Sequence, residues 1–200
     1  MVEIKTVIFD YNGVVTVLGK FDSLIVEYAV RCRVAEEDLE KVVRDKWALA
    51  RVGKINSMEF WRAIAEVLGY ETQQLRQEWL KRFPVRLDVL ALVHALQGKG
   101  YKTALLTNEI KDWMDEVIPA YSMQNCFDAI VTSYEVGAAK PDRRMYDAVL
   151  LQLGMNANQC VYIDDQTKNI VPAEELGFQT ILFESVEQMK KELRDFGVRI

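Results

Sequence analysis

The stretch that decides the fold lies near the N-terminus, where Thr6-Val7-Ile8-Phe9 is followed by Asp10. This short apolar, β-branched run predicts a buried parallel strand that ends at the aspartate. Similar runs recur at residues 103–106, 129–131, 160–163 and 180–183. Helical patterns separate these runs, at residues 87–97, 111–118, 142–153 and 169–176, the second ending before Pro119. Strands that alternate with helices predict an α/β fold with a doubly wound parallel sheet.

Residues 22–83 interrupt this alternation, because they contain no strand-like run. Four helical patterns follow one another here instead, at residues 23–33, 36–51, 57–68 and 72–83. We therefore predict an α/β core domain of residues 1–17 and 85–200, with a helical domain of residues 18–84 inserted after the first strand. Four large aromatic residues of the insertion are expected in its core: Trp47, Phe60, Trp61 and Trp79.

Composition excludes several classes of function. The 200 residues carry a net charge of -5, which argues against a nucleic-acid or anionic-membrane surface. No apolar run approaches the roughly 20 residues of a membrane span. The single histidine, His94, rules out chemistry that needs a histidine pair. The three cysteines form no C-x-x-C motif and fit buried thiols in a reducing, cytoplasmic setting. Nothing in the sequence indicates an oligomeric state.

Polar residues follow each of the first four predicted strands. In open α/β sheets, ligands bind beyond the carboxyl ends of the strands, so these residues are expected at one edge. Each has a structural explanation when taken alone, since Asn12-Gly13 could form a plain turn and Thr107-Asn108 a helix N-cap. Their convergence nevertheless predicts a functional site. The residues in question are Asp10-Tyr11-Asn12-Gly13, Thr107-Asn108-Glu109, Thr132-Ser133 with Lys140-Pro141, and Asp164-Asp165.

The chemistry of this edge favours a phosphoryl group. Several carboxylates close together need a cation, and oxygen ligands alone suggest a hard one, most simply Mg2+. Carboxylate, metal and the lysine at position 140 would together form a clamp for a phosphoryl group. Asp10 could then attack phosphorus and form an aspartyl-phosphate.

Four segments resemble, in order, the motifs of the haloacid dehalogenase-like superfamily. The resemblance spans nearly the whole chain and implies a Rossmann-like core with a small four-helix cap. Residues 53–61 also resemble the cap of sugar-phosphate-phosphatase-like members. Because Asp164-Asp165 is an acidic pair, the resemblance favours the metal-dependent phosphoryl branch over the dehalogenases, which need no metal. The segments are Phe9 to Val15, Leu106-Thr107-Asn108, Lys140-Pro141-Asp142 and Ile163-Asp164-Asp165.

The resemblance implies a role for each motif residue. Asp10 is expected to be the nucleophile, with Thr107 binding the phosphoryl oxygens and Asn108 orienting the nucleophile or the substrate. Lys140 would balance their negative charge. The expected Mg2+ ligands are Asp10, the carbonyl oxygen of Asn12, Asp165, and Asp164 either directly or through water. Asn169 is expected to lie behind these ligands at best.

Asn12 departs from the family pattern, because phosphatases of this family usually carry aspartate there. That aspartate protonates the leaving oxygen and then activates water, and an amide can do neither. Losing such help costs about 10²–10⁴-fold in rate. Three interpretations stay open: a slow phosphatase, an enzyme with substrate-assisted or other proton transfer, or a protein that only binds phosphate ligands or regulates. A substitution introduced into this sequence is a fourth.

The expected function is Mg2+-dependent hydrolysis of a small phosphomonoester, similar to a sugar phosphate, with a small phosphorylated metabolite as the partner. The alternative is a catalytically impaired binding or regulatory protein on the same fold. Arg51 and Lys54 flank Gly53 in the insertion and are candidates for substrate selection. An ordinary solvated surface explains these two side chains as well.

Overall fold

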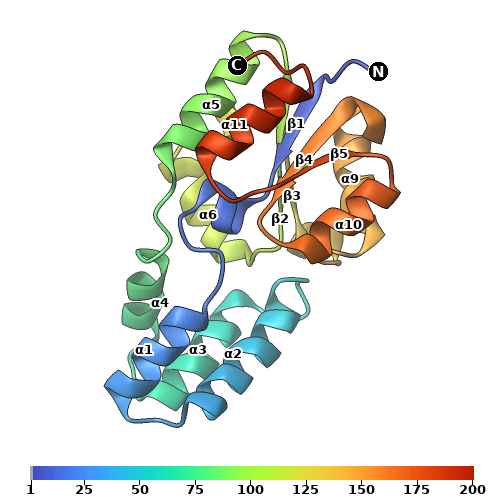
Figure 1. The fold of residues 1–200 in the computed structure, drawn as a ribbon. Helices are drawn as coiled ribbons and strands as arrows, with labels where there is room; N and C mark the ends of the chain where they lie inside the picture. The colour runs from blue at the N-terminus through green and yellow to red at the C-terminus, as the bar shows by residue number, and fades with distance from the viewer. Residues whose placement is uncertain (1) are drawn as a thin grey trace.

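The computed structural model describes residues 2–200 and contains one five-stranded parallel sheet (Figure 1). The strand order is β3-β2-β1-β4-β5, and every neighbouring pair is parallel. The predicted α/β fold is therefore confirmed. All five strands lie within two residues of their predicted positions: β1 (Thr6–Phe9), β2 (Lys102–Thr107), β3 (Ala129–Thr132), β4 (Cys160–Asp164) and β5 (Gln179–Leu182).

Helices cover both faces of the sheet. Side chains alternate along β1, so Val7 and Phe9 pack in one apolar cluster while Ile8 packs in the other. Both faces are buried, which explains why the strands read as continuous apolar runs. The first cluster includes α5 (Leu87–Gly98), α6 (Lys111–Ala120) and α11 (Val186–Asp195). The second includes α9 (Arg143–Leu153) and α10 (Thr167–Glu175).

The inserted segment forms four helices that pack on one another, α1 (Asp22–Cys32), α2 (Glu36–Ala50), α3 (Ser57–Leu68) and α4 (Thr72–Leu80). Figure 1 shows them grouped below the sheet, on the side to which the strands point their carboxyl ends. The Asn56 side chain caps α3 together with Glu59, and Gly69 ends the helix in the left-handed region. A ring of aromatic side chains around Phe21 fills the interior of the group.

The two connections between this helical group and the sheet run side by side. Thr16 and Val85 form an antiparallel bridge. The Val17 amide donates to the Pro84 carbonyl at 3.0 Å, and the Arg86 amide donates to the Val15 carbonyl at 2.7 Å. These bonds join the exit from β1 to the entry into α5.

Some features differ from the sequence-based expectations. Helix α6 continues through Pro119 to Ala120, because a proline in the last turn removes only one hydrogen bond near the helix end. Trp47 is half-buried, unlike the fully buried Phe60, Trp61 and Trp79. Cys32 is also half-buried, whereas the other two cysteines are buried. Four short elements carried no clear pattern: η1 (Tyr11–Val15), α7 (Met123–Cys126), α8 (Ser133–Val136) and η2 (Ala157–Gln159). Helix α11 was not predicted, although Val186, Met189 and Leu193 recur at helical spacing and are buried.

Of the helices formed by residues 2–200, none has the length and apolar character that crossing a lipid bilayer requires.

Candidate active site

The predicted site residues meet where the strand order reverses, between β1 and β4. The register places Phe9 opposite Ile163, and the Asp10 amide donates to the Ile163 carbonyl at 2.8 Å. Asp10 and the Asp164-Asp165 pair therefore leave the sheet side by side. Each of these three carboxylates offers an oxygen within 4.8 Å of the others. Such a switch point is where open α/β sheets bind their ligands.

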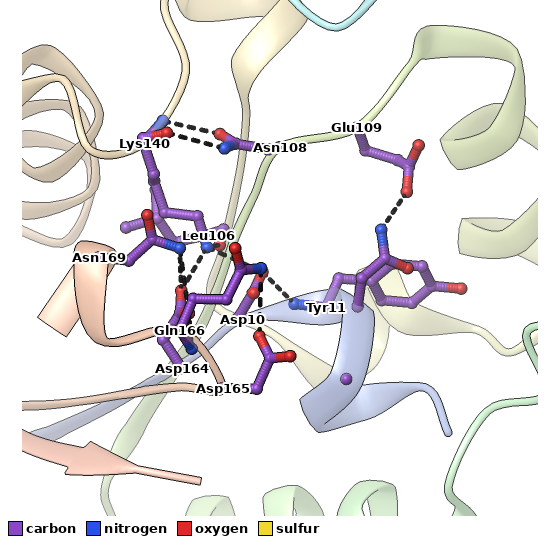
Figure 2. A network of polar contacts seen from close by, with 12 residues as sticks. Asp10, Tyr11, Leu106, Asn108, Glu109, Lys140, Asp164, Asp165, Gln166 and Asn169 are labelled. Atoms are coloured by element: carbon purple, nitrogen blue, oxygen red, sulfur yellow. Dashed lines mark hydrogen bonds and ion pairs between the residues drawn. The ribbon is translucent and has the colours of Figure 1, made fainter. Parts of the chain in front are cut away.

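Lys140 lies at the centre of the cluster (Figure 2). Its buried ammonium contacts Asp10 Oδ1 at 2.8 Å and Asp164 Oδ2 at 2.9 Å. It also donates to the Leu106 carbonyl at 2.8 Å and to the Tyr162 hydroxyl at 3.0 Å. One cation thus holds two buried carboxylates in place.

Asn108 positions this lysine rather than the nucleophile. Its Oδ1 accepts from the Lys140 backbone amide at 2.8 Å, and its Nδ2 donates to the Lys140 carbonyl at 3.0 Å. Neither of these two hydrogen bonds joins Asn108 to Asp10, which the expected orienting role would require. The side chain still lines the cavity described below, so contact with a substrate is compatible with this arrangement.

The two neighbouring acids of the fourth motif have different surroundings. Asp164 accepts hydrogen bonds from Lys140, from the Tyr162 hydroxyl and, at 2.8 Å, from the Gln166 amide. Asn169 Nδ2 adds contacts of 3.0 Å to both of its oxygens, so Asn169 lies behind Asp164 as expected. Within residues 2–200, the Asp165 carboxylate accepts one hydrogen bond, from Gln166 Nε2 at 3.3 Å. Asp165 is therefore the acid with free lone pairs.

Burial controls the charges in the cluster. It raises the pKa of Asp10 to about 8, although the Lys140 ammonium acts in the opposite direction. Burial also works to raise the pKa of Asp164, but Lys140 and the Tyr162 hydroxyl outweigh it and hold that pKa below its usual value. For the lysine, the two aspartates outweigh burial and raise its pKa. A cation beside Asp10 would favour its ionised form.

Two glycines leave just enough room for Asp165. A Cβ added to Gly13 would lie 2.6 Å from Asp165 Oδ2, and one added to Gly19 would lie 2.7 Å from the same oxygen. Gly13 also has a φ of 85°, which other residues rarely adopt. The backbone within η1 and in the loop after it can therefore approach the acidic cluster closely.

A cavity of about 640 Å³ opens between the strand ends and the inserted helices. Arg51 lines it, and its buried Nε has no hydrogen-bond partner within residues 2–200, while burial lowers the pKa of its guanidinium. Arg44, also in the lining, is already paired with Asp22 and Glu40. Other lining residues are Asp10, Asn12, Lys20, Phe21, Trp47, Asn108, Lys140 and Asp165.

Three predicted residues lie outside this lining, namely Asp164, Thr107 and Lys54. Asp164 is fully buried against Lys140. Thr107 is fully buried, and its hydroxyl lacks a hydrogen-bond partner among the described residues, at the strand end that carries Asn108. Lys54 lies in a different, smaller cavity of about 360 Å³ beside Ser57 and Lys111. The structure brings Arg51 to the site of Asp10 and leaves Lys54 apart from it.

Sequence reasoning placed Glu109 at the strand end without giving it a role, and it missed Tyr162 and Lys20. Glu109 is fully buried and accepts a hydrogen bond from Asn12 Nδ2 at 2.8 Å. It directly follows Thr107-Asn108, and that position was the available signal. Tyr162 lies two residues before Asp164 on the same strand face, where period two predicts a shared direction. Nothing in the sequence indicates that Lys20 lines the cavity.

The fold and this cluster define an α/β protein that carries its active site at the carboxyl edge of a parallel sheet. A family model described as haloacid dehalogenase-like hydrolase matches residues 4–177. The chain belongs to this family, and the membership expected from the four motifs is confirmed. Its assignment as a hydrolase follows from the same match.

Individual relatives support the phosphatase branch. D-ribitol-5-phosphate phosphatase of Bacteroides thetaiotaomicron is 25% identical over 207 residues, which cover 95% of this chain and 97% of that protein. Bifunctional epoxide hydrolase 2 of Sus scrofa is 28% identical over 132 residues, but the match covers 62% of this chain and 23% of that protein.

A solved structure of a haloacid dehalogenase family enzyme from Bacteroides thetaiotaomicron has a TM-score of 0.82 at 23% identity, covering 96% of this chain and 100% of that one. A magnesium complex of the same enzyme has a TM-score of 0.80. At this identity the likeness shows a shared fold.

Proposed function

We propose that this protein is a Mg2+-dependent phosphatase that hydrolyses a small phosphomonoester similar to a sugar phosphate. The observation that carries the proposal is the cluster of Asp10, Asp164 and Asp165 around buried Lys140 at the switch point of the sheet. The relatives named above include a sugar-alcohol-phosphate phosphatase and a magnesium complex, which agrees with this chemistry.

The residues present suit Mg2+. Three carboxylates lie close together, and Asp165 keeps lone pairs free for a cation. Mg2+ prefers such oxygen ligands and commonly uses one or two carboxylates together with substrate phosphate. Asp10, Asp165 and the Asn12 carbonyl are the proposed ligands. Asp164 orients the cluster and contacts the ion directly or through water. When bound, the ion would neutralise the phosphoryl oxygens and draw electron density from phosphorus.

Asp10 is the proposed nucleophile. Its Oδ1 accepts from the Tyr11 amide at 2.7 Å and from Lys140, so Oδ2 stays free to attack. The new bond joins this oxygen to phosphorus while the ester bond breaks, and the leaving alkoxide takes a proton from water. A second water then attacks phosphorus, the bond from phosphorus to the Asp10 oxygen breaks, and phosphate leaves. The proton that this water loses neutralises the hydroxide left by the first step. The unpartnered Thr107 hydroxyl would donate to a phosphoryl oxygen throughout.

The helical group supplies the substrate side of the cavity. We propose that residues 18–84 act as a cap domain over the core formed by residues 1–17 and 85–200. Arg51 is the cap cation with an unpartnered buried nitrogen, so an anionic substrate would compensate its charge. Lys20 lines the same cavity and adds a second positive charge there. Lys54 is left out of the proposed substrate contacts.

The test is phosphate release with Mg2+ from a panel of sugar phosphates and one activated aryl phosphate. Release is expected from the wild type and not from Asp10→Asn. The aryl ester should react relatively fast, because its leaving group needs little protonation and Asn12 cannot provide it. A panel without any Asp10-dependent release would refute the proposal.

Asn12 supports a second candidate function, a binding or regulatory protein without turnover. Beryllofluoride with Mg2+ mimics a phosphoryl group on a reactive aspartate. A working Asp10 site should gain thermal stability from the mixture. A melting temperature that does not respond would favour the second candidate.

A further inference from the structure

Glu109 is a buried acid that the proposed reaction does not use. Its side chain is fully buried at the end of β2, and in Figure 2 it lies apart from Lys140 and Asp164. Its Oε1 accepts from the Ile110 amide at 2.9 Å. Its Oε2 accepts from Asn12 Nδ2 at 2.8 Å. The carboxylate thus has two donors, and one of them is the residue that departs from the phosphatase pattern.

The backbone keeps Glu109 facing Asn12. The Glu109 amide donates to the buried Ser133 hydroxyl oxygen at 3.0 Å, and that hydroxyl donates to the Arg51 carbonyl. Asn12 is held on its other side, where Oδ1 lies 3.4 Å from the Thr16 hydroxyl. The two side chains cannot separate without breaking several of these bonds.

An amide suits this contact and a carboxylate does not. The amide of Asn12 supplies the hydrogen in the bond to Glu109. An aspartate at position 12 would place a half-buried carboxyl group against the fully buried one of Glu109, and a hydrogen bond between them would require one of the two to bind a proton. Binding that proton, or leaving the acceptors unpaired, costs free energy that the Asn12 amide avoids.

We propose that Glu109 is a positioning residue that selects asparagine at position 12, so that the two side chains form a matched pair. Asn12 is then required by its contact with Glu109, and it is more than the loss of the usual aspartate. The usual acid can return to position 12 only if position 109 changes with it. The rate consequence of this pairing rests on the proposed phosphatase function, whereas the pairing itself does not.

The experiment is a double-mutant cycle of Asn12→Asp and Glu109→Gln, measured first by thermal melting in the absence of Mg2+. Asn12→Asp alone should lower the melting temperature by roughly 5 °C or more. Glu109→Gln alone should also lower it, because the single glutamine oxygen cannot accept from both the Ile110 amide and Asn12 Nδ2. The double variant should regain most of the loss, since a glutamine amide can donate to the new carboxylate.

Asn125→Asp is the matched control, because the same chemical change there falls on an exposed residue of α7. It should leave the melting temperature unchanged. Additive shifts in the cycle, or a single Asn12→Asp variant as stable as the wild type, would overturn the pairing. If Asn12→Asp does not fold, a folded double variant upholds the pairing and an unfolded one overturns it.

The second readout is how the rate of hydrolysis depends on the leaving group. A residue with a merely structural role would not change this dependence. With Mg2+, the double variant should hydrolyse sugar phosphates about 10²-fold or more faster than the wild type, with a smaller gain on the aryl ester. It should also exceed Asn12→Asp alone on sugar phosphates. Coupled melting temperatures without phosphate release from any variant would uphold the pair and refute the proposed function.

Discussion

Gly19→Ala should weaken Mg2+ binding without changing any charge in the site. The added methyl carbon would lie 2.7 Å from Asp165 Oδ2, whereas ordinary contacts begin at 3.4 Å. The carboxylate oxygen must therefore retreat by about 0.7 Å, or the loop must shift with it. The φ of Gly19 lies outside the left-handed region, so alanine introduces no backbone strain at this position. Gly13 would be a poorer choice because its φ is 85°.

The size of this displacement sets the expected loss. Metal–ligand distances tolerate about 0.2 Å, and Mg2+ demands near-ideal octahedral geometry. Misplacing a metal ligand or its support commonly costs about 10–100-fold in affinity, which is about 1.4–2.7 kcal/mol. The thermal stability of the metal-free protein should change less, because the nearest atom is the tip of a half-buried side chain and the next, the Gly13 Cα at 3.2 Å, needs only a small shift.

Calorimetric titration with Mg2+ measures this effect directly. Gly98→Ala is the matched control, because a Cβ at Gly98 at the end of α5 meets nothing within 4 Å. The control should bind Mg2+ as the wild type does. The reasoning fails if Gly19→Ala binds Mg2+ as tightly as the wild type, or if both variants weaken equally.

Three further results are expected. Because burial raises the pKa of Asp10 to about 8 and Mg2+ requires its carboxylate, the apparent affinity for Mg2+ should rise up to about tenfold per pH unit until pH reaches about 8. Calorimetry in buffers of different ionisation enthalpy should show the released proton, and a flat profile would contradict the pKa. Lys140→Met leaves two buried carboxylates without their ammonium partner, so it should lower the free energy of unfolding, measured with urea, by about 3–5 kcal/mol. A decrease under about 1 kcal/mol would contradict the ion-pair geometry. Arg51→Ala should raise KM for sugar phosphates about tenfold or more with kcat little changed, and an unchanged KM would remove Arg51 from the substrate side.

The fold was predictable because short patterns carry it. The apolar runs of β1, β2, β3 and β4 are largely buried on both faces of the sheet, so composition alone marks them as strands, whereas the edge strand β5 is partly exposed. The inserted helices were equally readable, since the capping pair Asn56 and Glu59 and the glycine at position 69 mark the bounds of α3. Helix α6 extends past its expected end because a proline in the last turn removes only one hydrogen bond there.

The site was predictable only as far as strand ends determine it. Asp10, Lys140 and Asp165 come together because parallel strands share a carboxyl edge. The partition of roles between Asp164 and Asp165 depends on which carboxylate attracts donors, and the sequence does not show that. Arg51 and Lys54 looked equivalent as neighbours of Gly53, yet the turn after α2 sends them to different cavities.

Asn12 shows why a single position is hard to interpret without its surroundings. Compared only with the family pattern, it looks like the loss of an acid. In the folded chain its amide is the donor that a fully buried carboxylate requires, so position 12 cannot be judged apart from position 109. A rate measured after changing Asn12 alone would mix the gain of an acid with the cost of placing a second carboxyl group against the buried one of Glu109. Only the paired substitution separates the chemistry of position 12 from the packing that now holds it.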